Sequence, residues 1–446
     1  MKRITMITLL AVMAIHAVAL DVAITAGGLK DKVNDKTISS LTVTGTMNAA
    51  DFYFITDNLH QLTTIDLSGA RVVSCRLPEL RYMNNDFGAD ELPLGGLADL
   101  PLTHVVLPDS LKVIGKGALL GCGQLTEITL PSSLESINDY AFAACSALTT
   151  VVLPASVTTV GTGAFMRCTA LESITVEPSS RLTTLGDFAL MDCPALRSVN
   201  LGPALTTIGE RAFAGTGLRE LDLTANRSLT TIGDWAMVMT PVEQANMPNG
   251  LTHLGDGAFL YDTQLAAINL GDKLAQVGDY LLTGTSLAGT LKLPRVATVG
   301  DYALYNVSSL SVVELPSSLT FMGDSAMAGM TGLEALACQA SKVPDLGVGV
   351  WAGVNQGAIP LTVPYSARFQ YQAADQWQEF LVKSYGVPGD VNGDGEVTIA
   401  DINTLIDIIL NDGIGSDEET LIRADVNMDG EINVADINAV IAILLS

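Results

Sequence analysis

Two twelve-residue segments near the C-terminus carry oxygen-bearing side chains at a spacing suited to a divalent cation. They run from 390 to 401 and from 425 to 436, and in both of them positions 1, 3 and 5 are Asp, Asn and Asp. Position 6 is Gly and position 12 is Asp. Ca²⁺ takes about six to eight oxygen ligands, and glycine at position 6 permits the sharp turn that brings alternate residues round one ion. The repeated pattern therefore predicts two Ca²⁺ ions, one in each loop.

The candidate ligands stand at positions 1, 3, 5, 7, 9 and 12 of each loop. Position 7 would bind through its backbone carbonyl and position 9 through a water molecule. The expected metal ligands are Asp390, Asn392, Asp394, Glu396, Thr398 and Asp401 in the first loop, and Asp425, Asn427, Asp429, Glu431, Asn433 and Asp436 in the second. One match of this kind is compatible with chance, whereas two matches with every ligand position filled strongly indicate calcium.

Each loop leads directly into a short apolar helix, and no long helix precedes it. Pro388 stands before the first loop, and only the short run 418–424 precedes the second. Apolar residues recur at helical spacing after each loop; they are Ile402, Leu405, Ile406 and Ile409, then Ile437, Val440, Ile441 and Leu444. We therefore expect residues 390–446 to form a small all-α domain of two loop-plus-helix halves packed antiparallel, after a linker at 386–389.

Negative charge is concentrated in this segment. The chain of 446 residues has 23 Lys and Arg against 48 Asp and Glu, a net charge of −25. From Asp390 onward there are 13 carboxylates and one base, Arg423. Such a local field must be offset by cations if the segment is to fold compactly. The acidic balance also argues against nucleic acid or an anionic membrane as a partner, because both attract basic surfaces.

A repeat of about 23 residues fills most of the remaining chain. Its leading apolar residues are Leu102, Leu125, Leu148, Leu171, Leu196, Leu218, Val242, Leu265, Leu287, Leu310 and Leu333. The pattern L-x-x-[IV]-x-L turns three side chains inward on a short strand, and a proline then ends the strand, as at Pro131 and Pro154. One unit cannot bury its apolar side alone, but stacked units can. Residues 102–355 are therefore expected to form a β-rich solenoid of short parallel strands.

The N-terminus has the pattern of a secretory signal peptide over residues 1–19. Lys2 and Arg3 precede an apolar run, and Ala17-Val18-Ala19 supplies a cleavage site. An uncleaved membrane anchor is the alternative, but the run is short for a spanning helix. We expect a secreted or cell-surface protein with no membrane insertion after cleavage.

Four of the six cysteines recur at one position of the repeat. They are Cys122, Cys145, Cys168 and Cys193, each three residues before the next leading leucine. A column of buried thiols is the favoured interpretation, and a disulfide ladder or a metal site is the alternative. Neighbouring coils set Cβ atoms about 5 Å apart, which is longer than the roughly 3.8 Å of a disulfide.

The repeats closely resemble the BspA-like leucine-rich repeats of bacterial surface and secreted proteins, over about residues 21–385. Residues 20–101 would hold the N-terminal cap and first irregular repeats. Residues 356–385, with Tyr371, Trp377 and Phe380, look like the closing cap. The resemblance implies adhesion or ligand binding at a cell surface. Between about 71 and 101 the chain departs from the repeat, which makes this insertion either a candidate binding loop or simple coil padding.

From 388 to 446 the duplicated EF-hand-type loops resemble the type I dockerin module. Dockerins also close each loop with Asp, and the resemblance implies docking to a cohesin-like partner, usually in polysaccharide-degrading assemblies. Loop positions 10 and 11 are commonly a Ser-Thr pair in the best-known dockerins. Here they are Ile399-Ala400 and Val434-Ala435, which argues against the usual clostridial type of partner. A calcium-stabilised tail without a partner is the alternative.

The outward strand positions are rich in Ser and Thr and show no aromatic row; they include Thr126, Glu127, Thr129, Thr150, Glu220, Asp222 and Gln244. A polar sheet that faces a host or bacterial protein is therefore preferred to a glycan-binding groove, with an inert surface as a close alternative. No catalytic motif or cofactor-binding motif is present, so we expect no enzyme. Two functions remain: a non-catalytic interaction or adhesion protein, and a non-catalytic component of a polysaccharide-degrading assembly.

Overall fold

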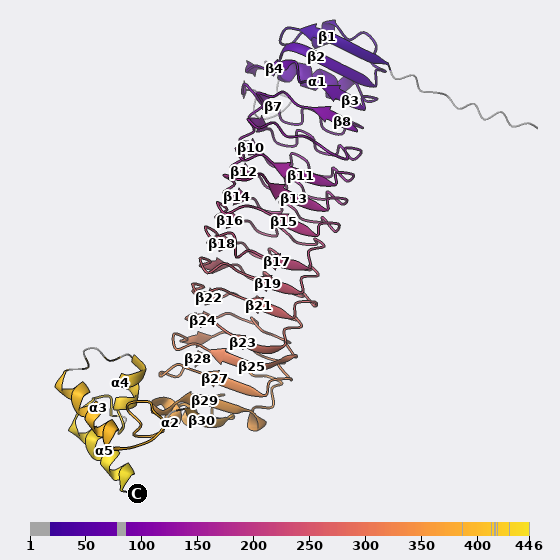
Figure 1. Ribbon diagram of the computed structural model, residues 1–446. Coiled ribbons are helices and arrows are strands. Elements are labelled where there is room, and N and C mark those ends of the chain that lie inside the picture. The colour runs from indigo at the N-terminus through magenta and orange to yellow at the C-terminus, as the bar shows by residue number, and fades with distance from the viewer. Residues whose placement is uncertain are drawn as a thin grey trace, which may run out of the picture. The chain divides into compact units, whose positions relative to one another are not determined.

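The computed structural model describes residues 18–77, 86–385, 387–411, 413, 416, 418–427 and 429–445 (Figure 1). Nearly all of the expected signal peptide therefore lies outside the described residues. The chain divides into two compact units, residues 1–177 and 178–446, which we describe one at a time. None of the helices in the described ranges combines the length and the apolar character that a membrane crossing requires.

The first unit opens with a parallel sheet and one helix. Strand β1 (Ala19–Ile24) pairs with β2 (Ser40–Met47), and β3 (Thr64–Asp66) and β8 (His104–Val106) extend the sheet, while β4 (Ala70–Val72) also pairs with β2. Helix α1 (Ala49–Asn58) begins at a capping box of Asn48 and Asp51. The buried Asp51 carboxylate also accepts hydrogen bonds from the backbone N–H groups of Gly27 and Leu29, at 2.7 and 2.9 Å. These bonds fix the helix against the short helix η1 (Leu29–Asp31).

Repeats then stack coil upon coil in the first unit. On one side lie β7 (Glu91–Leu92), β9 (Val113–Ile114), β10 (Ser136–Ile137) and β12 (Thr159–Val160), and on the other β11 (Thr150–Leu153) and β13 (Ser173–Val176). The strands pair in parallel and in register, as Ser136 with Thr159. Between the two sides the rings of Phe142 and Phe165 stack with centroids 5.1 Å apart. Each coil thus buries its apolar side against the next.

The expected insertion at 71–101 is only partly irregular. Strands β5 (Cys75–Arg76) and β6 (Asp86–Phe87) pair antiparallel, and residues 78–85 lie outside the described ranges. From β7 onward the segment follows the repeat, because β7 pairs in parallel with β9 of the next coil and Leu92 is fully buried. The departure from the repeat therefore ends before Glu91.

One expected strand of the first unit is not formed. The pattern predicts a strand from Leu125 to Leu130, but these residues have no regular strand pairing. The carbonyl of Thr126 still accepts from the backbone N–H of Thr149 at 3.0 Å. A hollow of about 630 Å³ lies here, lined by residues that include His104, Glu127 and Val152.

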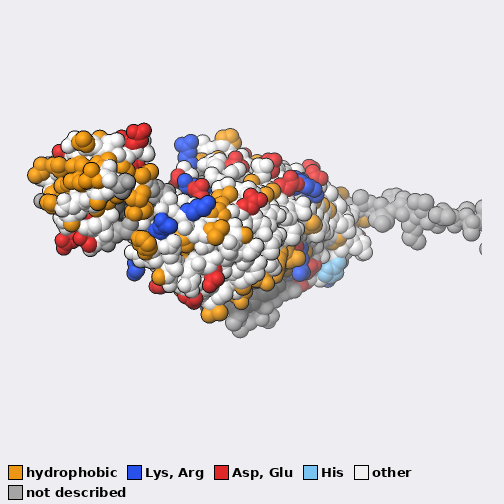
Figure 2. Space-filling model, turned by 90° about the horizontal axis from the view of Figure 1, so that it is seen from below, with side chains coloured by type: hydrophobic (Ala, Val, Ile, Leu, Met, Phe, Trp, Pro, Cys, Tyr) orange, Lys and Arg blue, Asp and Glu red, His pale blue; other side chains and the backbone are white. Residues whose placement is uncertain are grey.

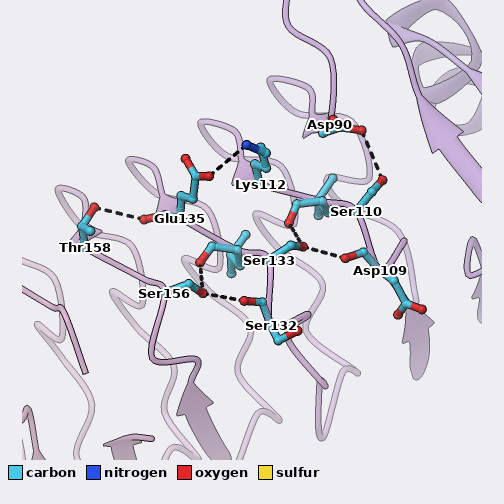
Figure 3. A network of polar contacts seen from close by, with 11 residues as sticks. Asp90, Asp109, Ser110, Lys112, Ser132, Ser133, Glu135, Ser156 and Thr158 are labelled. Atoms are coloured by element: carbon cyan, nitrogen blue, oxygen red, sulfur yellow. Dashed lines mark hydrogen bonds and ion pairs between the residues drawn. The ribbon is translucent and has the colours of Figure 1, made fainter. Parts of the chain in front are cut away.

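Hydrogen bonds from serine side chains connect the turns of this unit (Figure 3). Ser133 Oγ donates to the carbonyls of Asp109 and Leu111, at 2.6 and 2.7 Å, and Ser156 Oγ repeats the contact one coil later. Lys112 Nζ also lies 3.0 Å from Glu135 Oε1. Because backbone carbonyls at a turn lack strand partners, the serines supply the missing donors.

The second unit continues with stacked parallel strands (Figure 1). One side holds β14 (Thr184–Leu185), β16 (Thr207–Ile208), β18 (Thr231–Ile232) and β20 (His253–Leu254), followed by β22 (Gln276–Val277), β24 (Thr298–Val299), β26 (Phe321–Met322) and β28 (Asp345–Leu346). The other side holds β15 (Ser198–Asn200), β17 (Glu220–Asp222), β19 (Gln244–Asn246) and β21 (Ala267–Asn269), then β23 (Gly289–Lys292), β25 (Leu310–Leu315), β27 (Ala335–Cys338), β29 (Pro360–Pro364) and β30 (Leu381–Tyr385). The expected β-rich solenoid with a period of about 23 residues is confirmed.

Aromatic residues close the last repeat. The helices η2 (Gln356–Ala358), η3 (Tyr365–Ala367) and α2 (Arg368–Ala373) lie among its final strands. Trp377 contacts Tyr371 and Trp351 edge to face, with centroids 5.2 and 5.5 Å apart, and Phe380 lies 5.0 Å from Trp351. All four rings are buried, and the cap at 356–385 stays a prediction.

All six cysteines are free thiols. The Sγ atoms of Cys122, Cys145 and Cys168 each donate to a buried backbone carbonyl at 3.2 Å. Burial raises the pKa of the Cys145 thiol to about 12. Protonated thiols in an apolar slot agree with the favoured interpretation of this column.

Candidate calcium loops and docking surface

Three helices position the two candidate loops: α3 (Ile399–Leu410), α4 (Glu418–Ala424) and α5 (Val434–Leu444). Helix α3 begins at a capping box, in which Thr398 accepts from the Ala400 N–H and Asp401 bonds back to the Thr398 N–H. Asn433 and Asp436 form the same box at α5. Positions 9 and 12 of each loop therefore start the helix that follows.

The first three candidate ligands of each loop shape its turn. Asp390 accepts from the backbone N–H groups of Asp394 and Gly395, at 3.1 and 2.9 Å. Asp394 in turn accepts from the Glu396 N–H at 2.9 Å, and Asn392 Oδ1 accepts from the Asp394 N–H at 2.8 Å. Gly395 adopts a φ of +92°, which side chains rarely tolerate.

The second loop repeats these contacts. Asp425 accepts from the N–H groups of Asp429 and Gly430 at 3.1 and 3.0 Å. Asp429 accepts from the Glu431 N–H, and Asn427 Oδ1 from the Asp429 N–H, both at 2.9 Å. The described residues of the two loops thus make the same hydrogen bonds, although the loop sequences differ between the ligand positions.

The closing aspartates join the two ends of each loop. Asp401 is fully buried and accepts from the N–H groups of Asn392 and Thr398, at 3.0 and 2.8 Å. Asp436, also fully buried, accepts from Asn427 and Asn433 at 3.0 and 2.9 Å. A buried carboxylate needs hydrogen bonds or a cation to offset its desolvation, and here backbone N–H groups provide part of that compensation.

The donor chemistry of these loops fits Ca²⁺. Carboxylate, amide and backbone carbonyl oxygens are the ligands that this hard cation prefers. Within the described ranges, no three His, Cys, Asp or Glu side chains are grouped as a metal site would need. In the conformation described, the carboxylates at positions 1 and 5 bond to backbone amides and position 3 is Asn in both loops. The two-ion assignment and its twelve ligands stay a prediction.

The helices bury a small core. It comprises Val391, Leu405, Ile408, Ala424, Val426 and Val440, with Ile402, Ile409, Ile437 and Ile443 packed against it. Sequence reasoning missed Val391 and Val426, although both stand at loop position 2, between two candidate ligands. Arg423, the one base of this segment, donates to the Val391 carbonyl at 3.4 Å and to Thr420 Oγ1 at 3.0 Å.

The helical spacing is as expected, but not every apolar residue faces the core. Ile406 and Ile441, which belong to the expected helical pattern, are 37% and 38% exposed. Ile399, Leu410, Val434 and Leu445 are 70, 76, 63 and 82% exposed. These six residues occupy positions 10, 17 and 21 in each half, counted from the first loop residue. We call them the duplicated apolar face, and Figure 2 shows hydrophobic side chains gathered on this module.

The stacked coils define a leucine-rich-repeat solenoid, and the comparisons with known proteins agree. The model of the BspA type leucine rich repeat region matches in six copies, over 97–219, 183–296 and 288–353. Because these matches span more than half of the 446 residues, the chain belongs to this family. The model of the dockerin type I domain matches residues 388–445. Both expected resemblances are confirmed.

Three bacterial repeat proteins are among the solved structures that match this chain. A leucine-rich repeat protein from Bacteroides ovatus is 22% identical, covers 70% of this chain and 91% of its own, and gives a TM-score of 0.45. A leucine rich cell surface protein from Faecalibacterium prausnitzii is 20% identical, with 59% and 86% covered and a TM-score of 0.32. The pneumococcal vaccine antigen PcpA is 16% identical, with 79% and 80% covered and a TM-score of 0.35. No curated protein matches the chain.

Proposed function

We propose that this is an exported, non-catalytic interaction protein with two binding regions. Residues 20–385 bind a macromolecular ligand, and residues 390–446, folded around two Ca²⁺ ions, dock onto a protein partner. Leucine-rich repeats and dockerins are typically non-catalytic and serve protein interaction. The signal-peptide pattern at 1–19 supports delivery to the cell surface or the medium.

The duplicated apolar face carries the docking proposal. Large aliphatic residues exposed at three matching positions in both halves are costly in water, and contiguous exposed patches mark interaction sites. Ile399 and Val434 stand at loop position 10, where the best-known dockerins commonly carry Ser. We therefore propose a cohesin-like domain whose docking surface is apolar rather than hydroxyl-rich.

The dockerin match also favours a second function. In it, the protein is a non-catalytic component of a polysaccharide-degrading assembly, recruited through its C-terminal module. Both functions include docking of the C-terminal module onto a protein partner. Only in the second is that partner part of a polysaccharide-degrading assembly. The presence of cohesin-like domains in the source genome would favour the second function over the first.

The test measures binding of the mature full-length protein to such domains by surface plasmon resonance, with calcium and with a chelator. We expect binding that requires calcium and that falls at least tenfold when Ile399 and Val434 are both replaced by Ser. Thr404→Ser, on the same module, is the matched control. If calcium-loaded protein bound every cohesin-like domain as weakly as the double variant does, the docking proposal would be wrong.

A further inference from the structure

Aromatic side chains line one turn of the repeats in the second unit. Trp235, Tyr280 and Tyr302 each follow a Gly-Asp pair, and the Tyr280 and Tyr302 rings stack with centroids 5.2 Å and planes 3° apart. Met239 and Tyr261, four residues after Trp235 and Gly257, are 74% and 61% exposed. We call these five residues the aromatic strip. The expected lack of an aromatic row therefore applies only to the outward strand positions.

The backbone of the aromatic strip is strained. The φ angles of Trp235, Tyr261, Tyr280 and Tyr302 are 52, 58, 56 and 54°, in the left-handed region. A side chain in the left-handed region costs about 1 kcal/mol relative to Gly. The coil between Trp235 and Tyr280 has Gly257 at the repeat position of these two rings, with a φ of +57°. Stability alone would favour glycine throughout. Bulky rings at strained positions, two of them exposed and two half-buried, instead point to a role at the surface.

A column of carboxylates runs beside the strip. Asp234, Asp256, Asp279 and Asp301 stand at the same place in successive coils. The residues that follow them are Trp235, Gly257, Tyr280 and Tyr302. Each Oδ1 accepts from the backbone N–H of the next coil, at 2.7 to 3.0 Å. Burial, followed by the charges of Asp279 and Asp234, raises the pKa of Asp256. A positively charged ligand would relieve this repulsion.

Cations already lie over rings at this position of the repeat, and Lys116 Nζ is 5.8 Å from the centroid of the Tyr140 ring. The guanidinium carbon of Arg211 lies 4.4 Å from the centroid of the Trp235 ring. Guanidinium groups are flat and weakly hydrated, so they stack on aromatic faces better than ammonium groups do. Arginine, Tyr, Trp and Met are also the residues enriched where proteins meet.

We propose that the aromatic strip and its aspartate column bind an arginine-bearing, basic polypeptide segment. This inference rests on the proposed ligand-binding role of the solenoid and adds the chemistry of the ligand. It concerns none of the residues of the C-terminal module, so its failure would leave the docking proposal standing.

The test uses the mature full-length protein in calcium at about 0.15 M salt, where exposed charges more than about 8 Å apart are screened. Fluorescence anisotropy measures binding of labelled nona-arginine and nona-lysine peptides and of a neutral labelled cello-oligosaccharide. The variant combines Tyr280→Gly with Tyr302→Gly, because glycine tolerates the positive φ of both positions. Tyr140→Gly in the first unit is the matched control, because Tyr140 follows an Asp at the same position of the repeat and has a φ of 55°.

We expect the unmodified protein to prefer nona-arginine to nona-lysine. The double variant should lose about fivefold in arginine affinity and lose the preference, while Tyr140→Gly should match the unmodified protein. In Asp279→Asn with Asp301→Asn, which keeps the Oδ1 acceptors, both peptides should weaken alike. Unchanged arginine binding by the double tyrosine variant would overturn the proposal. Tyrosine-dependent binding of the oligosaccharide alone would also overturn it and identify a glycan surface.

Discussion

The carboxylate of Asp279 accepts a hydrogen bond from the backbone N–H of Asp301, one coil later, at 2.8 Å. The glycine before Asp301 makes room for it, because a Cβ on Gly300 would lie 2.3 Å from Asp279 Oδ1. The Gly-Asp pair of the repeat is therefore a connection between coils as well as a turn. The same contact joins Asp301 to the N–H of Asp324 at 2.7 Å.

Replacing Asp279 by alanine should destabilise the solenoid. The change leaves the Asp301 N–H without its partner, which costs about 1–2 kcal/mol of unfolding free energy. Asp279→Asn should lose less, because the amide oxygen can still accept. Urea denaturation followed by circular dichroism measures both, and equal losses in the two variants would contradict the role of the hydrogen bond.

The stability of the second unit should rise as pH falls through the range below 8. Asp262 is fully buried and accepts from Thr240 N and Oγ1 at 2.8 and 2.9 Å. Burial raises the pKa of Asp262 to about 8, against about 4 in the unfolded chain. Between these values the folded state binds the extra proton, so this contribution to stability is fully present below about pH 4 and is lost as pH rises through about 8.

Asp262→Asn tests this assignment. The amide is a neutral replacement, so the variant should be at least as stable as the unmodified protein at pH 8 and should show a flatter pH dependence. Melting temperatures from pH 4 to 9 provide the measurement. A variant much less stable at pH 8, with the slope unchanged, would show that Asp262 is charged in the fold.

Removing calcium should unfold the C-terminal module and leave the solenoid intact. Arg423 is the one base of the module against 13 carboxylates, and metal binding to such loops is coupled to folding. Chelation should therefore reduce helical signal while the strand signal stays. Calorimetry on the full-length protein should find two ions, falling to one in Asp394→Ala and to none in Asp394→Ala with Asp429→Ala; two ions in the double variant would contradict the assignment.

The two halves of the module should contribute alike to docking. Ile399 and Val434 occupy equivalent positions, and the loops have the same hydrogen bonds. The module would then bind its partner in two orientations. Ile399→Ser and Val434→Ser should each weaken binding to a similar degree in surface plasmon resonance, whereas loss from only one of them would count against two orientations.

Local patterns in the sequence are sufficient for much of this protein. The 23-residue period requires each coil to bury its apolar side on the next, so the parallel solenoid follows from short-range spacing. The helical spacing after each loop is equally local, since it involves residues within one or two turns. These features could be predicted because neighbours in the sequence determine them.

Contacts between helices and between coils decided which side chains are exposed. Ile406 belongs to an apolar pattern, yet it faces solvent, because only packing between α3 and α5 selects which side of the helix is covered. Tyr280 and Tyr302 are one repeat apart in the chain and meet only when coils stack. The low aromatic content of the sequence therefore gave no sign of the aromatic strip. The sequence by itself determined the repeat and the two loops, while the tertiary structure decided which side chains remain exposed, since exposure depends on neighbours that are distant in sequence.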